Sequence, residues 1–181
     1  MVYMFLANGF EEIEALYTVD VLRRAGVDIK TVGIGDKTIT GSHGIAVLCD
    51  TVNCEIEPSD ELEMVILPGG LPGSTNLDED PIVDKFISYA NENGKFICAI
   101  CAAPFILGKR GILSGKKAIC YPGFENQLDG ATVIHDAGCV RDGNIITGRA
   151  MGSADEFAFA ILSALCGEEI ANKIKKAIIL N

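Results

Sequence analysis

A cysteine at the end of an apolar run is the residue whose position best suits it for chemistry. The run Phe96–Ile100 leads into Cys101, and two alanines, Pro104 and a second apolar stretch follow. This order predicts a strand that passes directly into a helix, with Cys101 at the corner. A thiol there lies near a helix N-terminus, whose partial positive charge favours the thiolate. Cys101 is therefore a candidate nucleophile or redox-sensitive thiol, and the alternative interpretation is a buried cysteine that packs like alanine.

A pair of glycines is the second candidate. Gly69 and Gly70 follow an apolar run that ends at Leu67. Glycine has no side chain, so backbone N–H groups in this pair can approach a ligand closely. The N–H of Gly70 and the N–H of Ala102 together would suit an oxyanion hole. Taken alone, the pair is more typical of an ordinary tight turn.

Three glutamates near the N-terminus are the third candidate. Glu11 and Glu12 suit the first turn of a helix, where carboxylates complement the helix dipole. Glu14 lies one turn further on. A buried glutamate beside a thiol is hard to ionise, and it can hydrogen-bond the sulfur or move a proton. The alternative interpretation is a solvated helix face.

The other cysteines and the two histidines form weaker arrangements. Cys98 and Cys101 have the spacing of a dithiol motif, but Cys98 falls inside the predicted strand. No ligand spacing typical of zinc sites is present, so no metal is expected. A Cys–His pair would need His43 or His135 beside Cys101. Their places in a turn and a strand favour structural or exposed roles.

Strands and helices alternate along most of the chain, and this alternation predicts an α/β fold with a mostly parallel sheet. In such sheets the site lies at the carboxyl ends of the strands, where the three candidate segments end. A capping box is predicted from Ser153 and Glu156. The predicted strands are 2–7, 28–33, 63–67, 96–100, 117–121, 132–135, 139–141 and 144–147, with a hairpin at 38–40 and 44–48, and the predicted helices are 11–24, 81–93, 101–109, 154–166 and 168–176.

Composition narrows the class of protein. The 181 residues are 49% hydrophobic, which indicates one globular domain over 1–181. The net charge of −10 and the absence of a basic cluster argue against nucleic-acid binding. No apolar run is long enough to span a membrane, and the first strand lacks the basic flank of a signal peptide. Seven scattered cysteines, an odd number, indicate a reduced, cytoplasmic protein.

Taken together, the motifs resemble those of the ThiJ/PfpI superfamily, and within it the branch of the Parkinson-linked protein deglycase (the DJ-one branch). Several motifs in the family's order make the resemblance specific, where each motif alone would be weak. It extends nearly from end to end of the chain. The segments that carry it are 7–14, 19–26, 67–70, 99–104 and 156–158.

The resemblance implies a flavodoxin-like three-layer sandwich, with helices on both faces of the sheet, and a homodimer. It implies that Cys101 is the reactive cysteine on a nucleophile elbow, that Glu14 contacts it as a protonated carboxyl, and that Gly70 and Ala102 donate N–H groups. Members of this branch are described as glyoxalases (glyoxalase III) and deglycases. They need no cofactor and act on small aldehydes such as methylglyoxal or on glycated proteins. The alternative function is a redox sensor or chaperone, in which Cys101 is oxidised to sulfinic acid without turnover.

Departures from the family pattern qualify this activity. Some members of the family have a histidine near the reactive cysteine, and this chain has Tyr121 at that position. A phenol is a poor base at neutral pH. Cys101 is followed by alanine and not histidine, so no Cys–His peptidase is expected. His43 stands where the branch often has arginine, and with Arg24 it is expected to form a weak anion pocket. Gly69, Tyr121, Arg24 and His43 are the expected substrate-binding residues.

Overall fold

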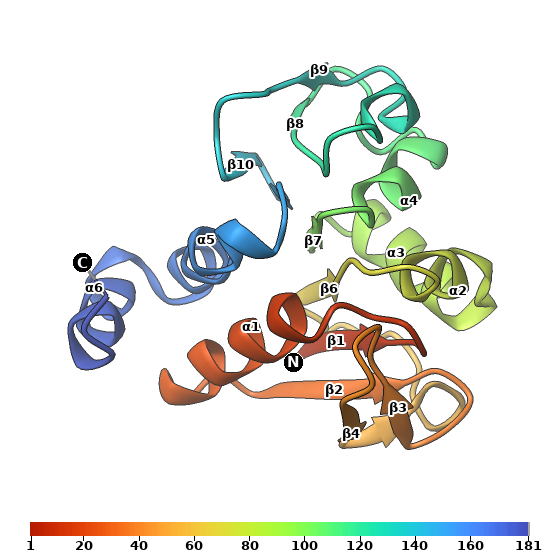
Figure 1. Cartoon of the computed structure of the whole chain (residues 1–181), viewed down its shortest axis with the longest axis horizontal. Coiled ribbons are helices and arrows are strands. Elements are labelled where there is room, and N and C mark those ends of the chain that lie inside the picture. The colour runs from red at the N-terminus through yellow and green to blue at the C-terminus, as the bar shows by residue number, and fades with distance from the viewer. Residues whose placement is uncertain (181) are drawn as a thin grey trace.

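The apolar runs of the sequence form the middle strands of a seven-stranded sheet. A parallel sheet is covered on both faces, so the side chains on both sides of its inner strands are apolar. The computed structural model describes residues 1–180 (Figure 1). The strand order is β10-β11-β7-β6-β1-β2-β5, and all neighbours are parallel except β10 and β11 at one edge. The strands are β1 (Val2–Leu6), β2 (Ile29–Gly33), β5 (Thr51–Val52), β6 (Met64–Leu67), β7 (Phe96–Ile100), β10 (Cys139–Asp142) and β11 (Ile145–Gly148).

Helices cover the sheet on both sides and complete a three-layer α/β sandwich of the flavodoxin-like type. On one side lie α1 (Glu12–Arg24) and α5 (Ala154–Cys166), with α6 (Glu168–Ala177) packed on α5. On the other side lie α2 (Gly73–Glu79), α3 (Pro81–Glu92) and α4 (Pro104–Lys109) (Figure 1). The expected fold class is therefore confirmed.

Alternation along the strands divides the core into two halves. In β1, Met4 and Leu6 belong to the core under α1 and α5, whereas Phe5 belongs to the core under α3 and α4. Successive side chains of a strand point to opposite faces, so each buried strand supplies both halves. The same rule directs the thiol of Cys98, which is fully buried, into the core under α5.

Two small ladders lie outside the main sheet. One is the predicted hairpin, formed by the antiparallel strands β3 (Thr38–Thr40) and β4 (Ala46–Leu48). The other joins β8 (Lys117–Ala118) to β9 (Thr132–Val133) in parallel. Single turns of 3₁₀ helix occur at Asn53–Glu55, Glu125–Gln127 and Met151–Ser153. Within residues 1–180, no helix combines the length and apolar character that crossing a membrane requires.

Several predicted boundaries were wrong, each for a local reason. The helix predicted from residue 101 begins at Pro104, because Cys101 has a left-handed backbone with φ of 64°. Strand 117–121 stops after Ala118, since the N–H of Ile119 bonds to the hydroxyl of Thr147. Ser153 does not cap α5, because its hydroxyl donates to the carbonyl of Ala150. Helix α2 and strand β5 were not predicted, as neither has an apolar periodicity.

The aromatic cluster under α3 gives a test of the fold. Phe86 is fully buried, and its ring meets those of Tyr3 and Phe5 edge-on at 5.3 and 5.2 Å. We expect Phe86→Ala to lower the free energy of unfolding by about 3–5 kcal/mol in urea titrations. The exposed neighbour Lys85, changed to alanine, should alter it by no more than about 0.5 kcal/mol. Equal losses in both variants would contradict this packing.

Candidate active site

Cys101 occupies a sharp corner directly after β7. Its φ of 64° is in the left-handed region, which is uncommon for a residue other than glycine. Two backbone hydrogen bonds hold the corner: the N–H of Cys101 donates to Gly148 at 3.0 Å, and its carbonyl accepts from the N–H of Tyr121 at 2.8 Å. The side chain is half-buried. The thiol is therefore presented at the carboxyl edge of the sheet by the segments on either side.

Glu14 projects from the first turn of α1 and has no exposed surface. One carboxyl oxygen, Oε2, accepts the N–H of Gly69 at 2.8 Å. The other oxygen, Oε1, is buried and has no hydrogen-bond partner among residues 1–180. The carboxyl of Glu11 caps α1 by accepting the N–H of Glu14 at 2.8 Å, which holds the start of the helix in place. The spare oxygen makes Glu14 a proton acceptor.

The thiol and the carboxyl influence each other's ionisation. Burial raises the pKa of Glu14 to about 7, although the neighbouring thiol of Cys101 and the N–H of Gly69 oppose the rise. Burial, and then the charge of Glu14, raise the pKa of Cys101 to about 12, although the N–H groups of Ala102 and Gly70 oppose this rise. The pair therefore keeps one proton between them above neutral pH, and this proton can reside on the sulfur or on the carboxyl.

The expectation that a helix N-terminus lowers the pKa of Cys101 was wrong. Helix α4 starts three residues later, at Pro104, so its dipole acts from a distance. Burial and the neighbouring carboxyl act directly on the thiol and outweigh it. At neutral pH a thiolate is favoured when Glu14 holds the shared proton.

The glycine loop serves both groups through its backbone. The carbonyl of Gly69 accepts the N–H of Glu11 at 2.9 Å. In a trans peptide the N–H points away from the carbonyl, and the N–H of Gly70 accordingly faces Cys101. A Cβ on Gly69 would lie 2.5 Å from both Cys101 Cβ and Glu14 Oε2. Only glycine fits there.

In the structure the N–H of Gly69 binds a group of the protein itself. It was predicted to bind substrate, but its N–H is used by Glu14. Tyr121 stays next to the reactive corner through its backbone bond to Cys101, and its side chain is 47% exposed. Its phenol can donate a hydrogen bond to a bound molecule.

The predicted anion pocket of Arg24 and His43 is not formed. Arg24 pairs with Asp20 at the C-terminal end of α1. His43 pairs with Glu12 at the other end, Nδ1 to Oε2 2.9 Å. Twelve residues of helix separate the two ends, or about 18 Å at 1.5 Å per residue. The sequence does not show which carboxylate each side chain pairs with. In the structure, Arg24 and His43 pair with carboxylates at opposite ends of α1, so the two cannot share a ligand.

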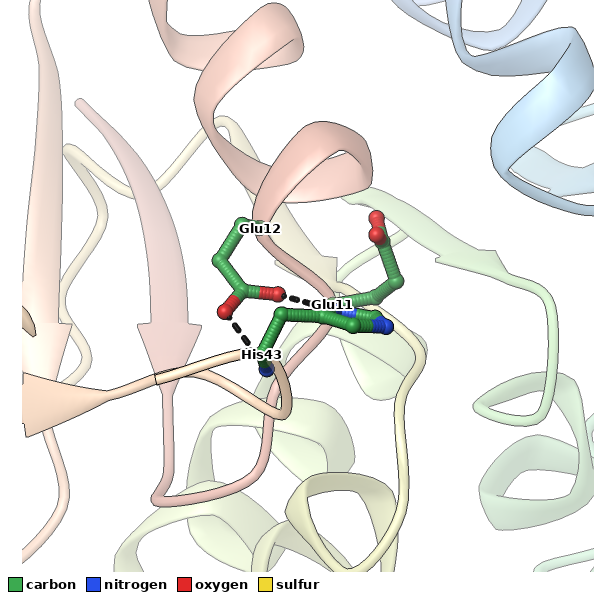
Figure 2. Close-up of side chains that lie close together, drawn as sticks. All are labelled: Glu11, Glu12 and His43. Carbon is green, nitrogen blue, oxygen red and sulfur yellow. Dashed lines mark hydrogen bonds and ion pairs between the residues drawn. The ribbon is translucent and has the colours of Figure 1, made fainter. Parts of the chain in front are cut away.

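Glu12, Glu11 and His43 are the group that comes nearest to a metal site in residues 1–180, with ligand atoms within 4.8 Å of one another. Figure 2 shows the carboxylate of Glu12 facing His43 from the start of α1. That carboxylate already accepts the N–H groups of His43 and Ile45, at 2.8 and 3.4 Å. Burial would raise the pKa of Glu12, yet the hydrogen bond with the His43 imidazole and those from the backbone N–H groups of Glu12, His43 and Ile45 lower it to about 2.

A cation at this group would compete with those N–H donors and with the positive end of the α1 dipole. Glu12 instead has a structural role: its carboxylate, at the start of α1, accepts hydrogen bonds from the turn between β3 and β4. Sequence analysis missed this role, because the two partners are 31 residues apart and no local pattern links them.

The chain is similar to known proteins over nearly its whole length. Residues 1–164 match the model of the DJ-1/PfpI family. The chain is 37% identical over 179 residues to "Protein dj-1beta" of Drosophila melanogaster, covering 98% of this chain and 95% of that protein. The crystal structure of Drosophila melanogaster DJ-1beta superposes with a TM-score of 0.94 at 36% identity, covering 99% of this chain and 97% of that one.

Two further relatives carry names that describe an activity. One is the "Glutathione-independent glyoxalase DJR-1.2" of Caenorhabditis elegans, 29% identical over 170 residues, which are 94% of this chain and 90% of that protein. The other is the "Deglycase PH1704" of Pyrococcus horikoshii, 34% identical over 165 residues, which are 88% of this chain and 95% of that protein.

The raised pKa of Glu14 predicts a pH dependence of stability. Its value moves from an ordinary 4.5 to about 7 in the fold, so the native state keeps a proton that the unfolded chain releases. This contribution is fully present below pH 4.5 and is lost as pH rises through 7. We expect the free energy of unfolding to fall by about 3 kcal/mol across this interval because of Glu14 alone.

Urea unfolding of wild type and Glu14→Gln at pH 4.5, 5.5, 6.5 and 7.5 measures this effect. The other titrating groups are common to both proteins, so the difference between the two curves isolates Glu14. Parallel curves over this range would show that Glu14 titrates as an ordinary carboxyl.

Proposed function

Because the chain belongs to the DJ-1/PfpI family, we propose that it is a cysteine-dependent, cofactor-independent glyoxalase and deglycase. Its substrates are α-oxoaldehydes such as methylglyoxal, or their adducts on proteins. The relatives named as a glutathione-independent glyoxalase and a deglycase support an enzymatic role in the family. The observation that carries the proposal is the fully buried Glu14 carboxyl, with one unpartnered oxygen, beside the thiol of Cys101.

The first step is addition of the thiol to the aldehyde. Sγ of Cys101 attacks the aldehyde carbon while Glu14 accepts the thiol proton, so the S–C bond forms as the C=O π bond breaks. The N–H groups of Gly70 and Ala102, which face the sulfur, are suited to stabilise the negative oxygen. Returning the proton from Glu14 to that oxygen gives a neutral hemithioacetal.

The second step is an internal redox exchange within the substrate. Glu14 removes the C1 proton of the hemithioacetal to give an enediolate and returns this proton to C2, while the proton of the C1 hydroxyl passes to the C2 oxygen; the product is a thioester with a neighbouring hydroxyl. C1 is oxidised and C2 is reduced by the same two electrons, so no external electron acceptor is needed. Water then hydrolyses the thioester, which releases lactate from methylglyoxal and restores the thiol.

Tyr121 and His43 are the proposed polar substrate-binding side chains. The phenol of Tyr121 is suited to donate a hydrogen bond to the second carbonyl of an α-oxoaldehyde. The pKa of His43 is raised by its hydrogen bond with Glu12 and by the carboxylate's charge, which favours a cationic imidazole there. Both side chains are largely exposed, consistent with a small substrate or a glycated protein surface.

A second candidate function is a redox sensor in which Cys101 becomes a sulfinic acid without turnover. Tyr121 favours it, because its phenol is a poor substitute for a histidine base in the catalytic cycle. The N–H groups of Gly70 and Ala102, together with a protonated Glu14, would also hydrogen-bond sulfinate oxygens. Both candidates use the same thiol and differ in whether an aldehyde or an oxidant reaches it.

Turnover separates the two functions. We expect the purified protein to convert methylglyoxal to lactate without glutathione, with kcat/KM rising through pH 7 as Glu14 ionises. Cys101→Ala should lose on the order of 10³-fold or more, and Glu14→Gln about 10²–10⁴-fold. Cys166→Ala, which changes an exposed thiol at the end of α5, should keep wild-type activity.

Lactate formation at equal, measurable rates in wild type and Cys101→Ala would refute the proposal of a cysteine-dependent enzyme. If neither protein forms lactate, mass spectrometry after mild peroxide tests the sensor. Two oxygens should then be added selectively at Cys101, whereas uniform oxidation of all seven cysteines would count against it.

The proposed assembly is a homodimer in the cytoplasm. Its support is three exposed apolar side chains: Ile13 at the start of α1, which is 49% exposed, and Ile45 and Leu48 on the hairpin, which are 54% and 72% exposed. Glu12 links the start of α1 to the hairpin through its bond to the N–H of Ile45. A second copy of this chain is the proposed occupant, and seven free thiols are consistent with a reducing compartment.

Sedimentation equilibrium tests the assembly. Ile13→Glu puts a charge in the middle of the proposed interface, so we expect wild type to sediment as a dimer and the variant to shift toward monomer. Ile179→Glu is the matched control, since that side chain is 83% exposed near the other end of the chain. A wild-type monomer at micromolar concentration would contradict the proposal.

A further inference from the structure

Ser74 is a buried polar residue whose hydroxyl serves one backbone group. It lies in the first turn of α2 and has no exposed surface. Its Oγ–H and its own N–H both donate to the carbonyl of Gly70, each at 2.9 Å. The carbonyl of Gly70 therefore has two donors from one residue, where a single donor would satisfy it.

Gly70 needs such restraint, because glycine is the residue with the greatest backbone freedom. It has a φ of 89°, and a Cβ there would lie 2.4 Å from the N of Glu11, so no other residue can replace it. Its conformation is set by the two peptide planes that flank it. The plane before Gly70 is held by the bond from Glu11 to the Gly69 carbonyl, and the plane after it is held by Ser74.

The N–H of Gly70 is one of the two backbone donors that face the sulfur of Cys101. This N–H lies in the plane before Gly70, which joins the plane held by Ser74 at the Cα of Gly70. When the Gly70 carbonyl is held less firmly, Gly70 can shift and its N–H can turn away from the sulfur. We propose that Ser74 is a positioning residue of the reactive cysteine: it holds the Gly70 carbonyl so that the Gly70 N–H stays directed at Cys101. This inference rests on the proposed function for its effect on turnover, but its effect on the thiol itself does not depend on any substrate.

Three substitutions distinguish positioning from simple packing. Ser74→Ala removes the hydroxyl and leaves the N–H bond, so the Gly70 carbonyl keeps one partner. Ser74→Thr retains a hydroxyl on a similar side chain and should rescue. Thr75→Ala is the matched control, because it removes an exposed hydroxyl from the adjacent position of α2. If Ser74→Ala does not fold, Ser74→Cys keeps the volume but donates only weakly.

Two measurements are made on each variant: the rate of Cys101 alkylation by iodoacetamide as a function of pH, and kcat and KM for methylglyoxal. We expect Ser74→Ala to shift the alkylation profile to higher pH, because the thiolate loses part of a hydrogen bond. Its kcat should fall on the order of 10-fold, less than the loss of a whole oxyanion donor, with KM nearly unchanged. Ser74→Thr and Thr75→Ala should follow wild type in both measurements.

A purely structural role would lower the thermal midpoint of Ser74→Ala and leave both the alkylation profile and kcat at wild-type values, and that result would overturn the proposal. The two proposals fail separately. If wild type shows no turnover, the proposed function fails, while the alkylation profile still decides the role of Ser74. If wild type turns over and the Ser74→Ala profile is unchanged, only the positioning role fails.

Discussion

The buried carboxyl of Glu14 constrains everything around the reactive cysteine. It has no exposed surface, and within residues 1–180 only one of its two oxygens accepts a hydrogen bond. A buried charge with too few partners is costly, so the carboxyl holds its proton up to about pH 7. Glu14 is therefore able to exchange a proton near neutral pH, beside the thiol that must gain and lose a proton.

The glycine loop connects this carboxyl to the sulfur. Successive N–H groups of one short segment point to different partners: that of Gly69 to Glu14, and that of Gly70 to Cys101. The loop is held from both sides, by Glu11 at the start of α1 and by Ser74 in α2. The same donors suit an alkoxide, a thiolate or a sulfinate, which explains why one geometry is compatible with both an enzyme and a sensor.

Patterns of apolar residues predicted the strands β1, β2, β6 and β7 and the helices α1, α3, α5 and α6. Burial on two faces or on one stripe leaves a clear periodicity in such elements. The short α2 has a single buried large side chain, Leu77, and left no such signal. The helix after β7 was predicted to begin about one turn too early, at Cys101. Local sequence does not reveal the left-handed φ of Cys101, which its backbone bonds to Gly148 and Tyr121 hold in place.

By itself the sequence determined which groups are available: a thiol after an apolar strand, a glycine pair after another, and a glutamate one turn into the first helix. The parallel order of the strands brings their carboxyl ends together, so the sequence also indicated that these groups meet. Only the tertiary structure decided how they act. Burial raises the pKa of the thiol that the helix end was expected to lower, and Glu12 and Asp20 hold apart the two side chains, His43 and Arg24, that were expected to share a ligand. Desolvation and pairing depend on neighbours distant in the chain, and no local pattern encodes them.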